Sequence, residues 1–600
     1  MDNKLGAVVA TAFVVAGLAM TPGATADTTA SIKPGAASAA TGASDAGFKR
    51  IYVKEWQWRV AQGLARAEGE RGVSPTLARA DAPAQEARRV YWAGILKELD
   101  AIEPARLSRP EQINYAVYRA QIGALHDALL YREYEQPANA DTAFWTDVTY
   151  GARRPFAGID DYRNYLRQLD ALPRYFDEEL GNMRAGLARG FTPPRVTLAG
   201  RDSTLVSVVD AKSPQDTVFY TPFKQMPASI PAAEQEALRA QAVAAIRDRV
   251  QPAHAKVLAF FRDDYVPKAR TTLAAEAMPG GKAYYQSKIV EFTTTNMTAE
   301  QIHAIGLSEM AKIRAEMHEV MRQVEFKGDL AAFLQFLRTD PQFYAKTPKE
   351  LLMAAAWTAK RFDAKADQYF GYLPRRRFAI VPVPDDQAPF WTAGRGGPGT
   401  YWVNTYNLPA RALYSLPALT LHESAPGHAF QGPIVQEQKG VPPFRRAYIS
   451  AYGEGWALYA ERLGVEMGIY ESPYEIFGML SYQAWRASRL VVDTGIHAKG
   501  WTREQAQAYL MENTALSKHE VETEVDRYIS WPGQALSYYL GQMAIQEARA
   551  RAEKGLGPKF DIRNFHDTVL QLGSVPLPVL QQRIDQFIAD GGPSPYPKEG

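Results

Sequence analysis

Apolar residues return every three or four positions through much of the chain, which is the pattern of amphipathic helices. Ala, Leu, Arg, Glu and Gln dominate these stretches, in agreement with intrinsic helix preference. Breaks that contain proline, such as residues 191–194, separate them. No fixed repeat period is visible, so an array of helical repeats is not expected. In the first half, the pattern predicts helices over Ile51–Glu68, Pro83–Leu99, Arg109–Leu130, Asp160–Leu187 and Ala232–Phe261.

A second helical series begins near Thr298, where Glu300 and Gln301 complete a helix-start signal. Helices are predicted through Val324, over Asp329–Arg338 and over Pro348–Tyr369.

Two short apolar runs then predict a small β-sheet at Arg377–Val383 and Thr400–Thr405. The glycine cluster between them, residues 394–399, lacks the Gly-Lys-Ser/Thr ending of a phosphate-binding loop, and a strand follows it. A strand at this place could offer its edge to an extended peptide. An ordinary small sheet is an equal alternative.

The first 46 residues depart from the helical pattern. Lys4, the apolar run Ala7–Met20 and the small residues Ala24-Thr25-Ala26 predict an export signal cleaved after Ala26. The apolar run is short for a membrane span, although a retained signal anchor is the alternative. Residues 27–46 are mostly Ala, Gly, Ser and Thr, which predicts a flexible leader.

Composition narrows the function classes. The formal net charge of +2 gives no reason to expect nucleic acid or an anionic membrane as partner. The chain contains no cysteine, which excludes disulfides, thiolate metal sites and cysteine nucleophiles. It also leaves no residue after the signal to carry a lipid anchor. A metal site must therefore use His, Asp and Glu, and nine histidines are available.

The stretch Leu421–His428 carries the strongest chemical signal, because it places two imidazoles and a carboxylate close together. Zinc hydrolases present two histidine ligands and a general base in this way. His422 and His428 are six residues apart, so a regular helix would rotate one roughly 120° away from the other. Pro426 would clash with the carbonyl group of His422, which predicts an interrupted helix between Glu423 and His428. A buried histidine followed by a Pro-Gly turn is the alternative.

A third protein ligand would leave one zinc position open for water. Glu454 follows His428 by 26 residues, enough for a loop and a second helix that packs against the first. Flanking Gly453 and Gly455 would allow close approach. Glu461 falls on nearly the same helical face and could hold a ligand histidine in the correct tautomer. Two carboxylates on a solvated face are the alternative.

Two later segments offer candidates for the transition state. Arg489, Asp493 and His497 are spaced at helical intervals, and His497 could act there, although a structural ion pair capped by histidine is the more common explanation. Tyr538 could donate a hydrogen bond to the developing oxyanion, and Arg527 could anchor a substrate carboxylate. Core packing is the alternative for the tyrosine.

These residues resemble a known family, the domain of unknown function 885 (DUF885). The resemblance extends from about residue 48 to the C-terminus and is carried by His422–Gln431, Glu454–Glu461, Val492–His497 and Pro532–Tyr538. The family resembles the α-helical zinc peptidases whose third ligand is glutamate. The resemblance implies His422 and His428 as ligands, Glu423 as base and Glu454 as third ligand. Many members carry a second histidine where this chain has Ala429, so that position is not needed as a ligand.

We therefore expect a mainly α protein with a two-lobed, zinc-peptidase-like architecture and a small β-sheet before the zinc helix. The expected divisions are a signal peptide (1–26), a leader (27–46), an N-terminal helical lobe (47–290) and a catalytic lobe (291–600). The expected function is an exported, periplasmic or secreted, zinc (Zn²⁺) metallopeptidase for short peptides, with no membrane partner after signal cleavage. The alternatives are a zinc-dependent amide or ester hydrolase with a non-peptide substrate, and a non-catalytic binding protein with a degenerate metal site.

Overall fold

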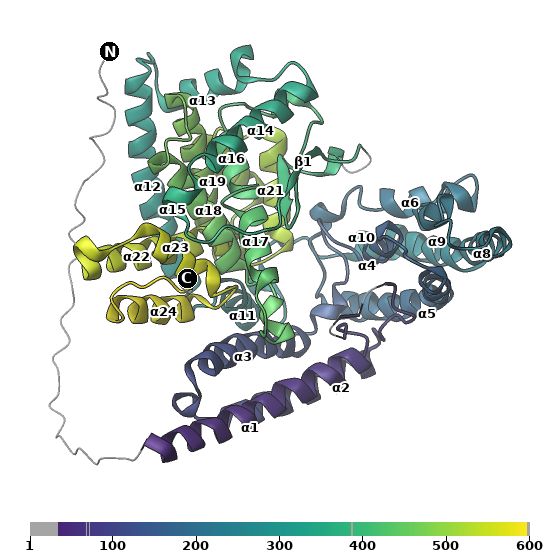
Figure 1. Ribbon diagram of the computed structural model, residues 1–600. Helices are drawn as coiled ribbons and strands as arrows, with labels where there is room; N and C mark the ends of the chain where they lie inside the picture. The colour runs from purple at the N-terminus through teal and green to yellow at the C-terminus, as the bar shows by residue number, and fades with distance from the viewer. Residues whose placement is uncertain (1–33, 68, 71, 386–387, 597–600) are drawn as a thin grey trace.

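The computed structural model describes residues 34–596 except 68, 71 and 386–387, and it is mainly helical with one small sheet (Figure 1). This agrees with the predicted mainly α class. The predicted signal peptide, residues 1–26, lies outside the described residues. No helix among the described residues is long and apolar enough to cross a membrane.

The N-terminal helices match the predicted periodicity closely. The first helix, α1 (Pro34–Ala61), begins inside the predicted leader, so residues 34–46 are helical and that part of the prediction is wrong. Phe48 is fully buried and Tyr52 nearly so, and the helix extends upstream from these anchors through alanine-rich sequence. The helices that follow are α2 (Ala82–Asp100), α3 (Arg109–Leu130), α4 (Phe144–Asp147), α5 (Ile159–Arg189), α6 (Ser203–Val209), α7 (Thr221–Lys224), α8 (Ala232–Ala245), α9 (Gln251–Phe260), α10 (Val266–Lys268) and α11 (Gly281–Thr293).

The later helices form the larger part of the fold. They are α12 (Ala299–Gln323), α13 (Leu330–Thr339), α14 (Pro348–Asp363), α15 (Ala366–Tyr369), α16 (Leu416–Glu423), α17 (His428–Glu437), α18 (Ser450–Glu466), α19 (Pro473–Lys499), α20 (Arg503–Asn513), α21 (Lys518–Ser530), α22 (Ser537–Leu556), α23 (Ile562–Gln571) and α24 (Leu577–Ala589). The predicted start at Thr298 is confirmed, since its hydroxyl accepts from the Gln301 N–H and the Gln301 side chain accepts from the Thr298 N–H.

Three strands make the sheet, in the order β1-β3-β2. The outer strand β1 (Ala379–Pro382) runs parallel to the central β3 (Thr400–Val403), and β2 (Gly394–Gly397) is antiparallel to it. The two predicted strands are confirmed. The glycine cluster, which the sequence placed between strands, itself forms β2.

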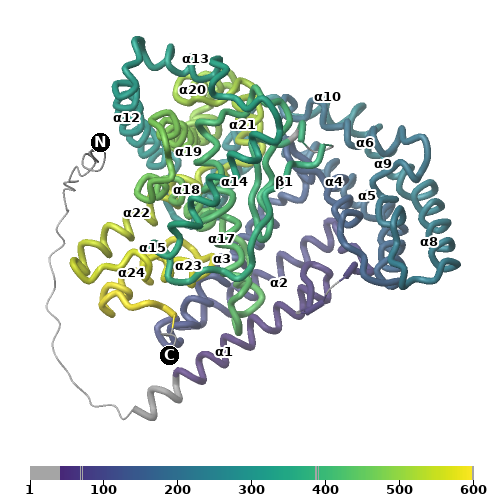
Figure 2. The backbone as a smooth tube through the Cα atoms, turned by 45° about the horizontal axis from the view of Figure 1, so that its top comes forward, coloured from purple at the N-terminus to yellow at the C-terminus, as the bar shows by residue number. Residues whose placement is uncertain are grey.

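The buried apolar side chains fall into three clusters. One surrounds α12, α13 and α19–α21, another lies within residues 73–269, and a third joins α1–α3 to α18 and α22–α24. In the third cluster, the rings of Tyr52 and Tyr118 lie 5.2 and 5.0 Å from that of Phe444. The boundary at residue 290 stays a prediction, but this cluster crosses it. Figure 1 and Figure 2 show α4–α10 gathered on one side, apart from α12–α24.

Candidate metal centre

Helix α16 is the central element of the site. Residues 416–422 are all buried, and the helix packs against α14, α18, α19 and β2. It ends at Glu423, and α17 begins at His428 after a cis Ala425–Pro426 peptide. The predicted interruption between Glu423 and His428 is therefore confirmed. A Cβ atom on Gly427 would lie 1.8 Å from the carbonyl oxygen of His422, so only glycine allows the chain to turn back this closely.

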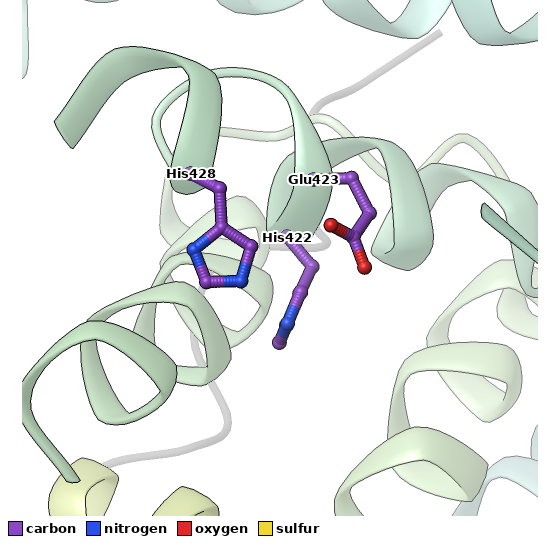
Figure 3. Close-up of side chains that lie close together, drawn as sticks. All are labelled: His422, Glu423 and His428. Carbon is purple, nitrogen blue, oxygen red and sulfur yellow. The ribbon is translucent and has the colours of Figure 1, made fainter. Parts of the chain in front are cut away.

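The interruption brings the two histidines together (Figure 3). Their ring centroids lie 4.9 Å apart, with the planes nearly perpendicular at 87°. One possible ligand atom from each of His422, Glu423 and His428 lies within 4.8 Å of the other two. His422 is buried, whereas Glu423 and His428 are partly exposed, so the cluster has one side open to solvent. A straight helix would have separated these groups.

Glu454, on α18, completes the set of donors. Its Oε2 atom lies 3.5 Å from Nε2 of His422 and 3.2 Å from Nε2 of His428. Ligand atoms bound to a tetrahedral zinc at about 2.0–2.2 Å are themselves about 3.3–3.6 Å apart. The three side chains thus already have nearly the separations that zinc requires. Nitrogen and carboxylate donors without thiolates are also a common zinc donor set.

Two glycines position Glu454. Gly453 leaves room for the ring of Tyr448, since a Cβ there would lie 2.2 Å from that ring. The Tyr448 hydroxyl donates to Oε1 of Glu454 at 2.9 Å. On the other side, a Cβ on Gly455 would lie 2.5 Å from the Cα of Gly541, so α18 and α22 cross in backbone contact. The close approach that the sequence predicted for Gly453 and Gly455 is present.

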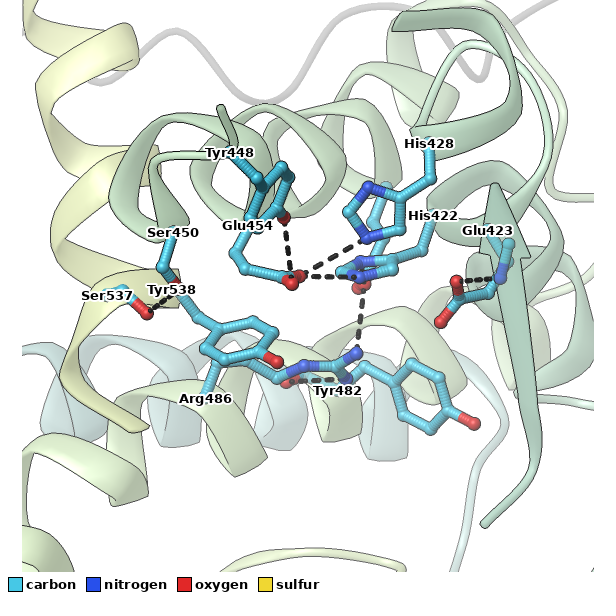
Figure 4. Close-up of polar contacts among 12 residues, drawn as sticks. His422, Glu423, His428, Tyr448, Ser450, Glu454, Tyr482, Arg486, Ser537 and Tyr538 are labelled. Carbon is cyan, nitrogen blue, oxygen red and sulfur yellow. Dashed lines mark hydrogen bonds and ion pairs between the residues drawn. The ribbon is translucent and has the colours of Figure 1, made fainter. Parts of the chain in front are cut away.

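Glu461 lies behind His422, as the sequence predicted. Its Oε1 accepts a hydrogen bond from Nδ1 of His422 at 2.8 Å, and the carboxylate is fully buried. This bond engages Nδ1 and leaves Nε2, which faces Glu454, as the nitrogen available to a metal. Arg486, also buried, lies 3.5 Å from the same Oε1 through Nη2 and partly balances the carboxylate charge. Figure 4 shows Arg486 on the side of His422 away from His428.

The electrostatics of the cluster favour an added positive charge. Burial lowers the pKa of His422, but hydrogen bonds to Glu454 and Glu461 outweigh it and raise this pKa to about 10. Burial raises the pKa of Glu454, but the neighbouring histidines hold it well below its ordinary value. A buried site that stabilises an extra proton in this way suits a divalent cation, which would take the place of the proton.

Glu423 is held beside the cluster by strand β2. The backbone N–H of Gly396 donates to its Oε2 at 2.6 Å (Figure 4). A Cβ on Gly396 would lie 1.8 Å from the carbonyl oxygen of Glu423, so a larger residue at position 396 would not fit beside the end of α16. The predicted base thus has a fixed orientation and is not one of the groups in contact with Glu454.

Tyr538 and Arg527 lie together on the side opposite Glu423. The Tyr538 ring is nearly parallel to that of His422, at 15° and 6.5 Å between centroids. Arg527 Nη2 donates to the Tyr538 hydroxyl at 3.2 Å and to the Gln534 side chain at 3.0 Å. The structure therefore places Tyr538 beside His422, and Arg527 in contact with the Tyr538 hydroxyl.

His497 lies elsewhere. It is fully buried on α19, where its Nδ1 accepts from the Ala275 N–H at 3.1 Å and its Nε2 donates to the Tyr528 carbonyl at 2.9 Å. Both nitrogens are engaged by backbone, and burial lowers its pKa to about 3. Neither nitrogen contacts His422, His428 or Glu454, so the role predicted for His497 at the transition state has no geometric basis. Its neighbour Asp493 accepts from Tyr285 rather than from Arg489.

Sequence reasoning missed Tyr448 and Arg486. Tyr448 lies just before α18, outside any motif, and the residue is 57% exposed. Arg486 lies one helical turn from Tyr482 on α19 and stacks on the Tyr482 and Trp485 rings. The flanking aromatic residues were the only local signal that this arginine is buried.

A cavity of about 340 Å³ borders α16 on the Glu423 side. Leu416 and Leu419 line it from α16, and Tyr482 lines it from α19. Leu419 lies one helical turn before Glu423, so the cavity and the base share one face of the helix. Its lining mixes apolar and aromatic side chains with charged ones, among them Arg338, Arg411 and Glu520.

The chain is similar to several known proteins. A family model described as "Bacterial protein of unknown function (DUF885)" matches residues 60–584. A solved structure described as "the putative lipoprotein from Colwellia psychrerythraea" is 26% identical, with a TM-score of 0.82, and the match covers 91% of this chain and 99% of that one. No curated protein matches.

A second solved structure, described as "a putative lipoprotein of unknown function from Shewanella oneidensis", shares the fold at 18% identity and a TM-score of 0.64. That match covers 90% of this chain and 98% of the other. The family model spans most of the chain, including the motifs that contain His422, His428 and Glu454. The protein therefore belongs to the DUF885 family of bacterial proteins.

Proposed function

We propose that this protein is a zinc-dependent metallopeptidase that hydrolyses short peptides. The observation that carries the proposal is the convergence of His422, His428 and Glu454 at 3.2–3.5 Å, with Glu423 held beside them. These three side chains would hold the metal. Zinc, when bound, would supply a Lewis acid that polarises a carbonyl group and favours the ionisation of water near neutral pH.

Glu423 would act as the general base. The Gly396 N–H holds Oε2, so Oε1 would accept the proton of the attacking water and later deliver it to the nitrogen of the leaving amine. The carboxylate is oriented before substrate arrives, which reduces the cost of positioning it in the transition state.

Tyr538 would stabilise the developing oxyanion. Its hydroxyl accepts from Arg527, which leaves its own proton available for donation to the substrate oxygen. Tyr448 would keep Glu454 in place through the 2.9 Å hydrogen bond. The apolar part of the cavity beside α16, lined by Leu416, Leu419 and Tyr482, would accept a hydrophobic side chain of a peptide substrate. The two-lobed, zinc-peptidase-like architecture is part of the same proposal.

We also propose that the protein is exported, periplasmic or secreted, because residues 1–26 have the composition of a signal peptide. Asp27 at the N-terminus of the mature protein would support this, and an intact Met1 in the exported fraction would contradict it.

The decisive variant is Glu423→Gln. It should retain stoichiometric zinc and lose at least a hundredfold in kcat on a panel of short peptides, because general base catalysis typically contributes about 10²–10⁴-fold. Glu236→Gln, an exposed change on α8, is the matched control and should hydrolyse peptides normally. Full peptidase activity in Glu423→Gln would remove Glu423 as base. Hydrolysis of simple esters but no peptide by the wild-type protein would favour the non-peptide alternative.

A further inference from the structure

The charge of Arg527 is not balanced by its contacts. Its Nη2 donates to two neutral oxygens, those of Gln534 and Tyr538, and its Nη1 lies 3.6 Å from Oε1 of Glu524. Glu524 already accepts from Nη2 of Arg489 at 2.8 Å. Two guanidinium groups therefore share one carboxylate, which leaves a net charge of about +1 beside the site.

Of the two arginines, Arg527 is the one that a solute can reach. About 30% of its side chain is exposed, against 2% for Arg489 and 2% for Glu524. Arg489 lies beneath, 4.2 Å from the centroid of the Tyr538 ring. The carboxylate of Asp141 also attracts Arg527, but Asp141 lies in an exposed loop, so water and salt screen its attraction.

Tyr538 lies between the Arg527 guanidinium and the ring of His422. Its ring faces His422 at 6.5 Å, and its hydroxyl touches Arg527 at 3.2 Å. An extended peptide spans about 3.3–3.6 Å per residue, so this chain of contacts keeps the guanidinium within a few residues' length of His422. Figure 4 shows Tyr538 and Glu423 on opposite sides of the histidine pair.

We propose that Arg527 binds the free C-terminal carboxylate of the substrate, so that the enzyme removes short fragments from the C-terminal end of peptides. Arginine is suited to this because its planar fork can form two charge-assisted hydrogen bonds with one carboxylate. The inference rests on the proposed peptidase function. In the reaction, water adds to the carbonyl carbon, the C–N bond breaks, and the proton goes to the amine of the fragment that carries the anchored carboxylate.

The first test measures binding without turnover. Ala-Ala-Phe and its C-terminal amide are titrated calorimetrically into the full chain after zinc has been removed. The free acid should bind about 10- to 100-fold more tightly than the amide, the range expected for a hydrogen-bonded charge pair. Arg527→Gln should abolish this ratio, and Arg527→Lys should retain part of it. Arg551→Gln, on the exposed face of α22, should leave the ratio unchanged.

The second test uses the zinc-loaded protein with longer peptides and their amides. The wild type should cleave the free acids with a lower KM than the amides, and Arg527→Gln should raise KM for the acids alone. Unchanged zinc content and an unchanged thermal melt would show that Arg527→Gln folds normally despite its contact with Glu524.

The two proposals fail in different ways. Equal binding of acid and amide, or no binding of the acid at millimolar concentration, overturns the carboxylate site, even if the protein hydrolyses peptides. Preferential binding of the acid that Arg527→Gln abolishes, together with no hydrolysis of any peptide, supports the carboxylate site and overturns the peptidase function.

Discussion

At the scale of single residues, the hydrogen bond between His422 and Glu461 determines which nitrogen of His422 is available to a metal. Glu461 accepts from Nδ1 of His422, so Nε2 remains the atom available to a metal. The 0% exposure of Glu461 and the nearby Arg486 make this contact strong and fixed. The same carboxylate, together with Glu454, raises the pKa of His422 to about 10 in the metal-free chain.

Glu461→Gln should therefore weaken zinc binding by about 10- to 100-fold, the usual effect of losing the partner of a ligand histidine. The amide can still accept a hydrogen bond from Nδ1, but it lacks the charge that makes the imidazole a better ligand. Competition with a chromogenic chelator measures the change, with Glu236→Gln as control. An affinity equal to that of the wild type would show that Glu461 does not act through His422.

His497 gives a prediction for acid stability. Its pKa is about 3 in the folded protein and about 6.5 when unfolded, so only the unfolded chain takes up this proton between those values. Stability from the neutral histidine is intact above about pH 6.5 and is lost as pH falls toward 3. The loss amounts to about 2 kcal/mol at pH 5, at about 1.4 kcal/mol per unit.

Comparison with His497→Gln measures this effect. The difference in free energy of unfolding between wild type and variant, from urea titrations, should shrink by about 2 kcal/mol between pH 7 and pH 5. For the exposed His318→Ala on α12, the difference in free energy of unfolding from wild type should be the same at pH 7 and pH 5. A constant difference for His497→Gln would mean that His497 takes up its proton in the folded state.

At the scale of elements, the site depends on a helix that stops and restarts. Pro426 alone was enough to predict the interruption, because a proline inside a helix blocks the bond to the residue four positions earlier. The strand β2 was not predicted, since glycine has low strand preference. The need for glycine at position 396 depends on a contact distant in sequence, the approach of Gly396 to Glu423.

Gly427→Ala tests whether the site needs the close turn between α16 and α17. The new Cβ would overlap the carbonyl oxygen of His422, so α17 must shift and carry His428 away from Glu454. We expect a stability loss of about 1–3 kcal/mol, typical of overpacking, and at least a tenfold loss of zinc affinity. Gly94→Ala in α2, where no other atom lies within 4 Å, is the control and should be neutral or slightly stabilising. Undiminished zinc affinity in Gly427→Ala would show that the close turn is not needed for the site.

At the scale of the whole molecule, the sequence predicted the helical class, most helix positions and the convergence of His422, His428 and Glu454. It could not show that α3 packs against the segment before α18, since that depends on contacts such as Tyr118 with Phe444. It also assigned His497 to the site, because helical spacing cannot tell which neighbour a side chain meets. Arg486 and Tyr448 were not predicted either, because their contacts with Glu461 and Glu454 depend on how the chain folds.

The central claim is that three helices of one chain, α16, α17 and α18, hold a single zinc ion. X-ray absorption at the zinc edge, with metal analysis of the purified full chain, tests it most directly. We predict one zinc per chain, bound by two imidazole nitrogens and by oxygen at about 2.0–2.2 Å, and loss of this signal in His422→Ala and His428→Ala but not in His318→Ala. Less than stoichiometric zinc, or a spectrum without imidazole ligands, would contradict the account.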